Sequence, residues 1–284
     1  MKGLKALRLG SLSLRWQPRT ALVCAVLLVA MLLLWALLLG TGSLSLGPEQ
    51  VLANLLGQGQ DPTAQRVLQR VRLPRALTAT LVGAALGMAG AIFQSISRNA
   101  LGSPDVIGFT TGAASGAIVQ IMLFDAGPLA TSLAAVAAGL GTALLVLLLA
   151  RNGHSSGGYR LVLVGIGVGA SLSGLNSILL VSGNLDQAMF AQLWLAGSLN
   201  TRTWSHVLPA ALGLLLIAPI ALYHARRINL LEMGDATASQ LGVAVERTRL
   251  IMVLAAVGLT AIATAAAGPL SLIHISEPTR LRRI

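Results

Sequence analysis

The side chains best suited to metal binding or nucleophilic catalysis are scattered along the chain. The histidines stand near the ends of apolar segments, and no pair of them has the close spacing of zinc ligands. They are His154, His206, His224 and His274. Cys24 is the only cysteine and lies within an apolar run, so an intramolecular disulfide is excluded. We therefore expect no catalytic centre, no metal site and no cofactor site.

A polar stretch of soluble character, Glu232–Arg249, separates two long apolar runs. Asp235 can cap a short helix over Ala236–Leu241, and Gly242 can end that helix. A plain connection between membrane helices can be far shorter than this. An ordered insert between basic flanks predicts a docking surface for another protein. An ordinary solvated loop is the alternative.

The composition is that of a polytopic membrane protein. Of the 284 residues, 55% are apolar and only 10% are charged, with a mean hydropathy of +0.79. A soluble domain carries about 25% charged residues. The net charge of +11 comes mostly from Lys and Arg beside apolar runs. That distribution is typical of residues that fix membrane topology, so we expect no nucleic-acid partner.

Seven apolar runs have about the 20 residues that a membrane-spanning helix needs. They are Ala21–Leu39, Ala76–Ile96, Val106–Phe124, Pro128–Ala150, Leu161–Val181, Ser205–Tyr223 and Leu250–Ala267. Leu185–Leu199 is too short to span and is interpreted as a partly inserted helix on the outer side. Glycine pairs four residues apart predict close helix packing. These pairs are Gly83/Gly87, Gly112/Gly116 and Gly165/Gly169.

The basic residues favour a cytoplasmic N-terminus, with membrane lipid around the spans. In that orientation the inner segments hold 12 Lys and Arg residues up to Arg249, whereas the outer segments hold 5. The outer set is Arg66, Arg70, Arg72, Arg75 and Arg202. Four of these precede the second span and run against the rule, so they need a separate explanation.

The middle of every predicted span lacks Asp, Glu, Lys and Arg. Ion-coupled carriers usually place such groups at the bilayer midplane. The pattern therefore disfavours a secondary carrier, and energy for transport would have to come from a partner. Polar span residues such as Gln94, Gln120 and Asn176 either bond neighbouring helices or line a cavity. A membrane enzyme or assembly factor with a cytoplasmic docking loop is a further alternative.

Three stretches together resemble the iron-chelate and vitamin B12 permease family of bacterial ABC importers. They are Arg72-Leu-Pro-Arg75 leading into Gly83–Gln94, then Arg98–Phe109, and finally Glu232–Arg249 followed by Ala267–Ser271. Within the family the chain most resembles the ferric enterobactin permease subunits. That closer likeness rests on the run from Gly102 to Phe109 and the run from Leu230 to Asp235.

The resemblance implies an all-α polytopic type II ABC importer permease with seven of the family's ten transmembrane helices. It implies import of a ferric siderophore, of the enterobactin-like catecholate kind, across the bacterial inner membrane. The implied partners are a second permease subunit (expected to be a paralogue), two cytoplasmic ATP-binding subunits that hydrolyse ATP, and a periplasmic siderophore-binding protein.

The resemblance also implies roles for individual residues. The ATPase contact would include Glu232, Gly234, Asp235, Ala236, Leu241, Gly242 and Arg247. Arg72 and Arg75 would receive acidic residues of the binding protein, which would explain the outer arginines. Asn99, Leu101, Asn152 and Gly153 would belong to the inner gate.

The last residues depart from the family pattern. We interpret 1–271 as an incomplete permease domain and 272–284 as a foreign tail, because the family continues differently after the Gly268–Ser271 motif. The tail resembles a translated sequencing adaptor. As a native tail it would also place Arg280, Arg282 and Arg283 on the outer face, against the charge bias.

Overall fold

The structure is a computed structural model with two compact units, Met1–Ala76 and Leu77–Ile284, called the N-terminal and C-terminal units. It describes residues 5–9, 12–16, 18–42, 44–59, 61–99, 102–103, 108–125, 127–150, 158–200 and 202–269. The predicted foreign tail lies outside this part of the chain, as do Leu101, Asn152 and Gly153.

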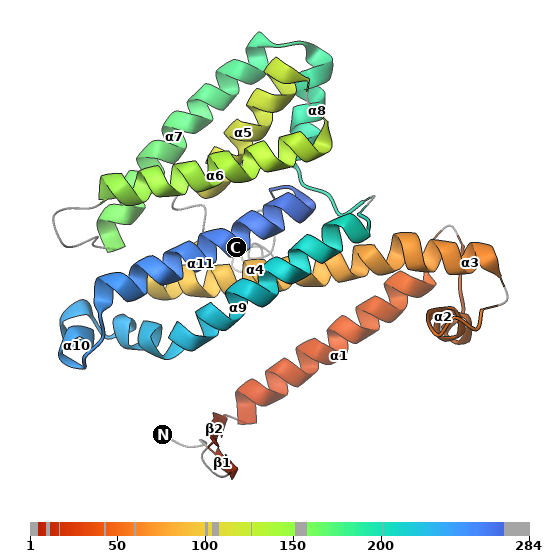
Figure 1. The fold of residues 1–284 in the computed structure, drawn as a ribbon, viewed down its shortest axis with the longest axis horizontal. Coiled ribbons are helices and arrows are strands. Elements are labelled where there is room, and N and C mark those ends of the chain that lie inside the picture. The colour runs from red at the N-terminus through yellow and green to blue at the C-terminus, as the bar shows by residue number, and fades with distance from the viewer. Residues whose placement is uncertain are drawn as a thin grey trace, which may run out of the picture. The chain divides into compact units, whose positions relative to one another are not determined.

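The N-terminal unit is built around one long apolar helix and a group of short helical segments (Figure 1). In chain order the elements are β1 (Lys5–Leu9), β2 (Leu12–Trp16), α1 (Pro18–Gly40), α2 (Pro48–Leu55), α3 (Pro62–Val67) and a π-helical turn, η1 (Leu68–Arg72). The two strands form an antiparallel hairpin in which Leu9 pairs with Leu12. The all-α class is confirmed, and this short hairpin is its one addition among the described residues. Elsewhere the unit is helical, with a small core of Leu39, Val51 and Leu68.

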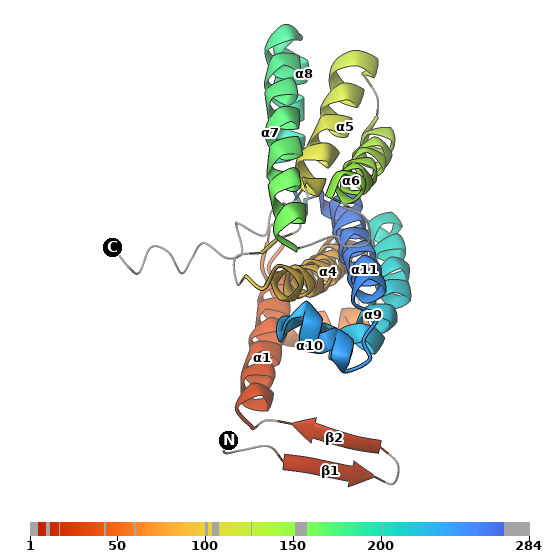
Figure 2. The ribbon, with the colours of Figure 1, turned by 90° about the vertical axis from the view of Figure 1, so that its left-hand side faces the viewer.

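The C-terminal unit contains most of the long helices. They are α4 (Leu73–Ser97, which starts before the unit boundary), α5 (Phe109–Phe124), α6 (Pro128–Ala150), α7 (Gly158–Ser182), α8 (Leu185–Leu195), α9 (Trp204–Glu232), α10 (Asp235–Gln240) and α11 (Val245–Ala267). Figure 2 shows the same helices after a quarter turn, with the short α10 near the ends of α9 and α11.

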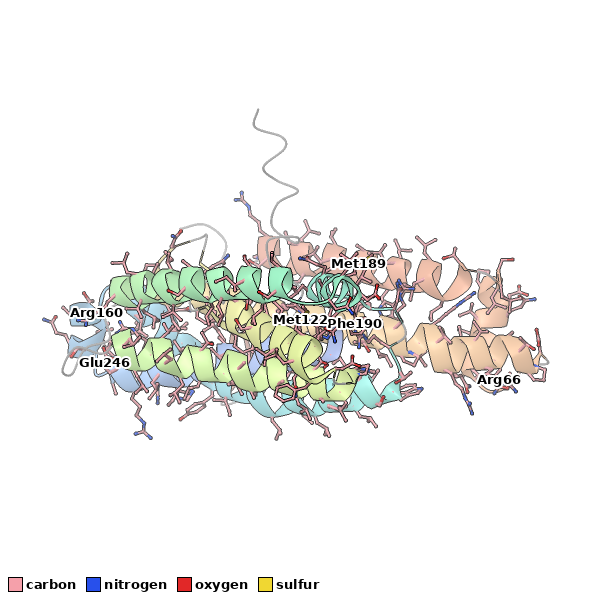
Figure 3. The ribbon with its side chains drawn as sticks, turned by 90° about the horizontal axis from the view of Figure 1, so that it is seen from above. Arg66, Met122, Arg160, Met189, Phe190 and Glu246 are labelled. Carbon is pink, nitrogen blue, oxygen red and sulfur yellow. The ribbon has the colours of Figure 1, made fainter. Side chains whose placement is uncertain are left out.

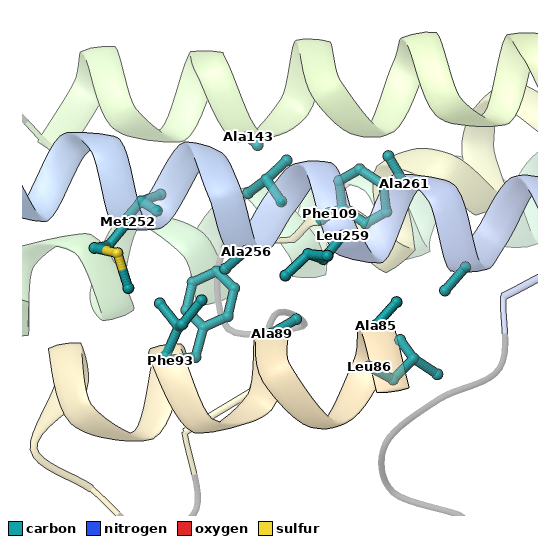
Figure 4. Close-up of a cluster of buried hydrophobic side chains, with 14 of the residues drawn as sticks. Ala85, Leu86, Ala89, Phe93, Phe109, Ala143, Met252, Ala256, Leu259 and Ala261 are labelled. Atoms are coloured by element: carbon teal, nitrogen blue, oxygen red, sulfur yellow. The ribbon is translucent and has the colours of Figure 1, made fainter. Parts of the chain in front are cut away.

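Helix α11 forms the centre of the C-terminal unit. It lies between α4 and α6, and its side chains Met252, Ala256 and Leu259 are almost fully buried (Figure 4). Ala89 and Phe93 of α4 belong to the same buried cluster. Because the buried faces combine small and large apolar residues, the helices interdigitate closely.

Within the described residues, six helices are long and apolar enough to cross a bilayer, which confirms the polytopic helical class. They are Pro18–Gly40, Pro62–Ser97, Pro128–Ala150, Arg160–Ser182, Trp204–Glu232 and Val245–Ala267. The third predicted span is the exception. Its helix, α5, begins only at Phe109, after Gly108 in a left-handed conformation, and has 16 residues. At 1.5 Å per residue this is about 24 Å, short of a full span.

The three glycine pairs behave differently. On α5, a Cβ at Gly116 would lie 2.6 Å from the Cβ of Ala138 on α6, so the predicted close packing is confirmed there. Gly83 and Gly87 on α4 have no such neighbour within 4 Å among the described residues. A Cβ at Gly169 on α7 would be only in ordinary contact, at 3.8 Å from Thr111 Oγ1.

Two further expectations concern polar residues and the short helix. The segment expected to be a short helix is helical over α8, where Asn184 Oδ1 accepts a hydrogen bond from the Asp186 backbone N–H at 3.2 Å.

Buried oxygens of Gln120 and Asn176 have no hydrogen-bond partner within the described chain. Helix–helix bonding is therefore not observed for these two oxygens.

Candidate functional site

The polar insert Glu232–Arg249 lies at one end of the C-terminal unit. Helix α9 ends at Glu232, the short helix α10 follows, and α11 begins at Val245. Figure 3 shows Glu246 of this segment at the same end of the unit as Arg160 of α7, whereas Met122, Met189 and Phe190 lie together away from that end. The insert and the start of α7 thus lie at the same end of the C-terminal unit.

The ends of α10 agree in part with the sequence prediction. The helix starts one residue early, so Asp235 is its first residue rather than its cap, and Gly234 takes the cap position. At the other end, Gly242 has a φ of +80°, and its N–H donates to Ser239 O at 3.0 Å. The Val243 N–H donates to Ala238 O at 3.0 Å. These two bonds form a Schellman motif, so the role of Gly242 as a helix terminator is confirmed.

The Asp235 side chain forms ion pairs instead of capping the helix. Its Oδ2 accepts a hydrogen bond from Arg249 at 2.8 Å, and its Oδ1 pairs with Arg98 at the end of α4. Arg249 also donates to Glu246 Oε1 at 2.7 Å. Arg98 reaches further and donates through Nε to the Leu231 carbonyl at 3.1 Å. We call the Arg98, Asp235 and Arg249 set the arginine bridge.

The arginine bridge keeps the Asp235 carboxylate charged. Burial alone would raise its pKa, but the hydrogen bond and charge of Arg249, together with those of Arg98, outweigh it and lower the pKa below the ordinary 3.8. Asp235 also stands at the N-terminus of α10, where a negative charge is favourable. The bridge is therefore an ion-paired set throughout the neutral pH range.

Arg98 adopts a backbone conformation unusual for its residue type. Its φ is +50°, in the left-handed region, and it directly follows the last residue of α4. The Arg98 N–H donates to Ser95 O and the Asn99 N–H to Gln94 O, which is again a Schellman motif. Glycine normally fills this position, and a residue with a Cβ costs about 1–3 kcal/mol there. Strain of this kind is a reason to look for a function.

A polar pocket opens beside the arginine bridge. Its volume is about 440 Å³. It is lined by Ala91, Gln94, Ser95, Arg98, Asn99 and Glu232. Of the predicted gate residues, only Asn99 is described, and it is exposed on this pocket. The structure thus brings Asn99 and Glu232, predicted for two different roles, to one pocket.

The predicted ATPase-contact residues form a largely exposed surface. Glu232, Ala236, Leu241, Gly242 and Arg247 are exposed, whereas Gly234 and Asp235 are half-buried. Two large apolar side chains, Met233 and Leu241, are also exposed there, at 64% and 58%. Both side chains lie outside the predicted spans, so membrane lipid does not account for their exposure.

The two predicted docking arginines differ within the N-terminal unit. Arg75 is exposed, but Arg72 is only 7% exposed and bonds the end of α1. Its guanidinium donates to the Leu39 carbonyl at 2.6 Å and to the Leu44 carbonyl. It also lies against Gly42, where an added Cβ would be 2.7 Å from the nearest guanidinium nitrogen. In this geometry Arg72 stabilises the unit, and Arg75 is the member of the pair that faces outward.

Sequence reasoning missed the functional interest of Arg98 and Arg249. Both were counted as basic residues that fix topology and stood at the ends of two family-like stretches, but neither was given a role of its own. The ion pair between Arg98 and Asp235 joins residues 137 apart, so no local pattern reveals it. A local signal for Arg98 was its position directly after the apolar helix α4, where glycine is the usual residue.

The comparisons with known proteins place these apolar helices and their charged insert in the class of ABC transporter permeases. A protein assigned to the metal-chelate type of ABC transporter, solved in an inward-facing conformation, superposes with a TM-score of 0.78 and 29% identity, covering 94% of this chain and 82% of that one. The FecCD transport family profile matches residues 10–284. The chain therefore belongs to the FecCD transport family.

Relatives of known assignment extend this comparison. The chain is 48% identical to the ferric enterobactin transport system permease protein FepG of Escherichia coli over 267 residues, covering 94% of this chain and 80% of FepG. It is 34% identical to the Fe(3+)-citrate import system permease protein YfmE of Bacillus subtilis, with coverage of 95% and 80%. It is 36% identical to the E. coli permease protein FepD of the ferric enterobactin system, with coverage of 90% and 77%.

Proposed function

We propose that this chain is a permease subunit that imports a ferric siderophore of the enterobactin-like catecholate kind across the bacterial inner membrane. The observation that carries the proposal is the 48% identity to FepG along 94% of the chain. Relatives named for ferric citrate are less similar, at 34% and 38% identity. The N-terminus is cytoplasmic in this proposal, as the basic residues favour.

The proposed complex has a second permease subunit, expected to be a paralogue, because the chain is similar both to FepG and to FepD. Two ATP-binding subunits supply the energy and dock on the surface of Met233 and Leu241. A periplasmic binding protein docks at Arg75, through charge-assisted hydrogen bonds from its carboxylates. Asn99 and the undescribed residues Leu101, Asn152 and Gly153 form the inner gate.

The cargo is tested by uptake of radioiron in cells that express the full transporter from its own locus and lack other iron importers. We expect uptake of ferric enterobactin at more than about ten times the rate for ferric citrate or a ferric hydroxamate, a difference of about 1.4 kcal/mol in transition-state binding. Equal or faster uptake of ferric citrate would contradict the catecholate assignment.

The ATPase docking surface is tested with Leu241→Asp, which places a charge in the exposed apolar patch. We expect loss of ATPase co-purification and of uptake, with normal membrane insertion. Asn229→Asp is the matched control, because Asn229 is an exposed residue on the last turns of α9 and the charge change is the same. Normal uptake by the Leu241→Asp transporter would refute docking at this surface.

The binding-protein contact is tested by Arg75→Glu and by the double variant with Arg72→Glu. We expect Arg75→Glu alone to weaken association with the binding protein, most strongly at low salt, because exposed charges are screened by ions. Arg226→Glu on α9, at the opposite end of the predicted topology, is the control. Unchanged association of Arg75→Glu at low salt would exclude this contact.

A further inference from the structure

We infer that Arg98 is a positioning residue that couples the docking helix α10 to the proposed gate residue Asn99. The inference rests on the proposed function, in that the ATPase must dock on the insert that contains α10. It assigns to Arg98 the task of transmitting a displacement of α10 to Asn99, the next residue along the chain.

The arginine bridge joins four helix ends within the C-terminal unit. Arg98 extends from the end of α4, bonds the Leu231 carbonyl near the end of α9, and pairs with Asp235 at the start of α10. Arg249, whose side chain is only 5% exposed, holds the other carboxylate oxygen from the first turns of α11. A movement of α10 is therefore shared with the end of α4 as well as with α11.

Asn99 directly follows Arg98, and both its backbone N–H and its carbonyl are hydrogen-bonded. The Asn99 N–H donates to Gln94 O at 3.1 Å, and the Gly102 N–H donates to Asn99 O at 2.9 Å. A Cβ at Gly102 would lie 3.0 Å from Phe93 O, so Gly102 packs directly on the end of α4. A shift of the Arg98 side chain therefore acts on Asn99, whose backbone is held on both sides.

The left-handed backbone of Arg98 supports a functional role for its side chain. Glycine at this position would end α4 without strain, as glycine does at Gly242 after α10. The chain instead holds an arginine there, and its guanidinium makes both the contact to α9 and the contact to α10. The strained position is explained if that side chain is needed.

This geometry allows a sharp experiment, because Arg98→Gly removes the guanidinium and relieves the backbone strain at once. The full transporter, with its ATPase and binding protein, is reconstituted in liposomes. Three quantities are measured: retained ATPase, ATP hydrolysis, and ferric chelate imported per ATP hydrolysed. Arg98→Lys keeps the charge, and Arg226→Gln is an exposed cytoplasmic control at the end of α9.

We expect Arg98→Gly to retain the ATPase and hydrolyse ATP while importing about tenfold less chelate per ATP, within the usual range for coupling between sites. Arg98→Lys is expected to import chelate per ATP at a ratio within about threefold of the unaltered transporter, since lysine keeps the charge but not the forked geometry of arginine. Arg226→Gln should behave as the unaltered transporter.

Two results would overturn the inference. One is an unchanged ratio of chelate to ATP in Arg98→Gly. The other is a parallel loss of ATPase retention, hydrolysis and transport in that variant, which would show that Arg98 only supports the fold. Failure of the unaltered permease to retain the ATPase would instead count against the proposed function, so the two outcomes are distinguishable.

Discussion

Asp235 shows how one carboxylate can serve two helices. Its two oxygens are shared between Arg98 and Arg249, and both arginines lower its pKa. A carboxylate with a lowered folded-state pKa stabilises the protein fully above its ordinary value of 3.8. That contribution is lost as the pH falls through the folded-state value.

The first prediction concerns the pH dependence of this contribution. Asp235→Asn is expected to lower stability by about 0.5–1 kcal/mol at pH 5–8, a small value because the Asp235 side chain is half-exposed. The difference from the unaltered protein should shrink only below pH 3.8. Denaturant unfolding in detergent at several pH values measures it. A difference that vanished already near pH 6 would contradict the lowered pKa.

The second prediction separates the two docking arginines. Arg72→Ala is expected to destabilise the N-terminal unit by about 1–3 kcal/mol, because the carbonyls of Leu39 and Leu44 lose their donor. Arg75→Ala should change stability by less than about 0.5 kcal/mol, since Arg75 is exposed. Unfolding of both variants in detergent provides the comparison, and equal effects would refute the stabilising role of Arg72.

Among the elements, the contact between α5 and α6 depends most clearly on glycine. Gly112 and Gly116 face α6 at distances that admit no side chain, and a Cβ at Gly139 of α6 would lie 2.7 Å from the ring of Phe109. Phe109 itself is fully buried. Close approach of backbones is a main source of helix association where lipid replaces water.

The third prediction tests this contact with two matched substitutions. Gly116→Ala is expected to cost about 1–3 kcal/mol, because the new methyl group overlaps Ala138 and forces the helices apart. Gly83→Ala on α4 meets no atom within 4 Å among the described residues, and should be neutral or stabilising by up to about 1 kcal/mol. If Gly83→Ala lost stability and Gly116→Ala did not, the account of Gly116 as the glycine required for close helix packing would be contradicted.

The sequence predicted the spans well because apolar length is a local property. The helices extend beyond the apolar runs, so α9 continues to Glu232 and α11 begins at Val245 rather than Leu250. Polar residues with adequate helix propensity simply prolong the helix. The start of α5 and the separate behaviours of Gly83 and Gly116 depend on which helix faces which, and this information is not local.

The site was predictable only in outline. Gly242 was recognisable as a helix terminator, because glycine at that position has a local reason. The partners of Asp235 were not, since Arg98 lies 137 residues away. Likewise, the motif Arg72-Leu-Pro-Arg75 does not show which of its arginines is buried. The π-helical turn that ends at Arg72 changes which residues face inward, and no local pattern predicts that turn.

At the scale of the whole molecule, the fourth prediction concerns residues 272–284. We expect them to be foreign to the permease, because Arg280, Arg282 and Arg283 would lie on the outer face against the charge bias. Resequencing the locus should replace this run from about Leu272 with an apolar one. A clean read that again encodes Leu272-Ile-His-Ile-Ser-Glu-Pro-Thr-Arg280 would contradict this expectation.

For the whole molecule, we propose that a partner ATPase supplies the energy. The predicted spans carry no charged residue at their middle that would serve an ion-coupled carrier, and the exposed insert is the proposed surface for the ATPase. ATP dependence and ion dependence are therefore the two properties that most clearly separate an ABC permease from a secondary carrier.

The most direct test of this account is uptake of ferric enterobactin by the complete transporter in liposomes, with and without ATP, and with and without a protonophore. We predict uptake that requires ATP on the side of the ATPase and is unaffected by the protonophore. Uptake without ATP that the protonophore abolishes would show an ion-coupled carrier and contradict the account.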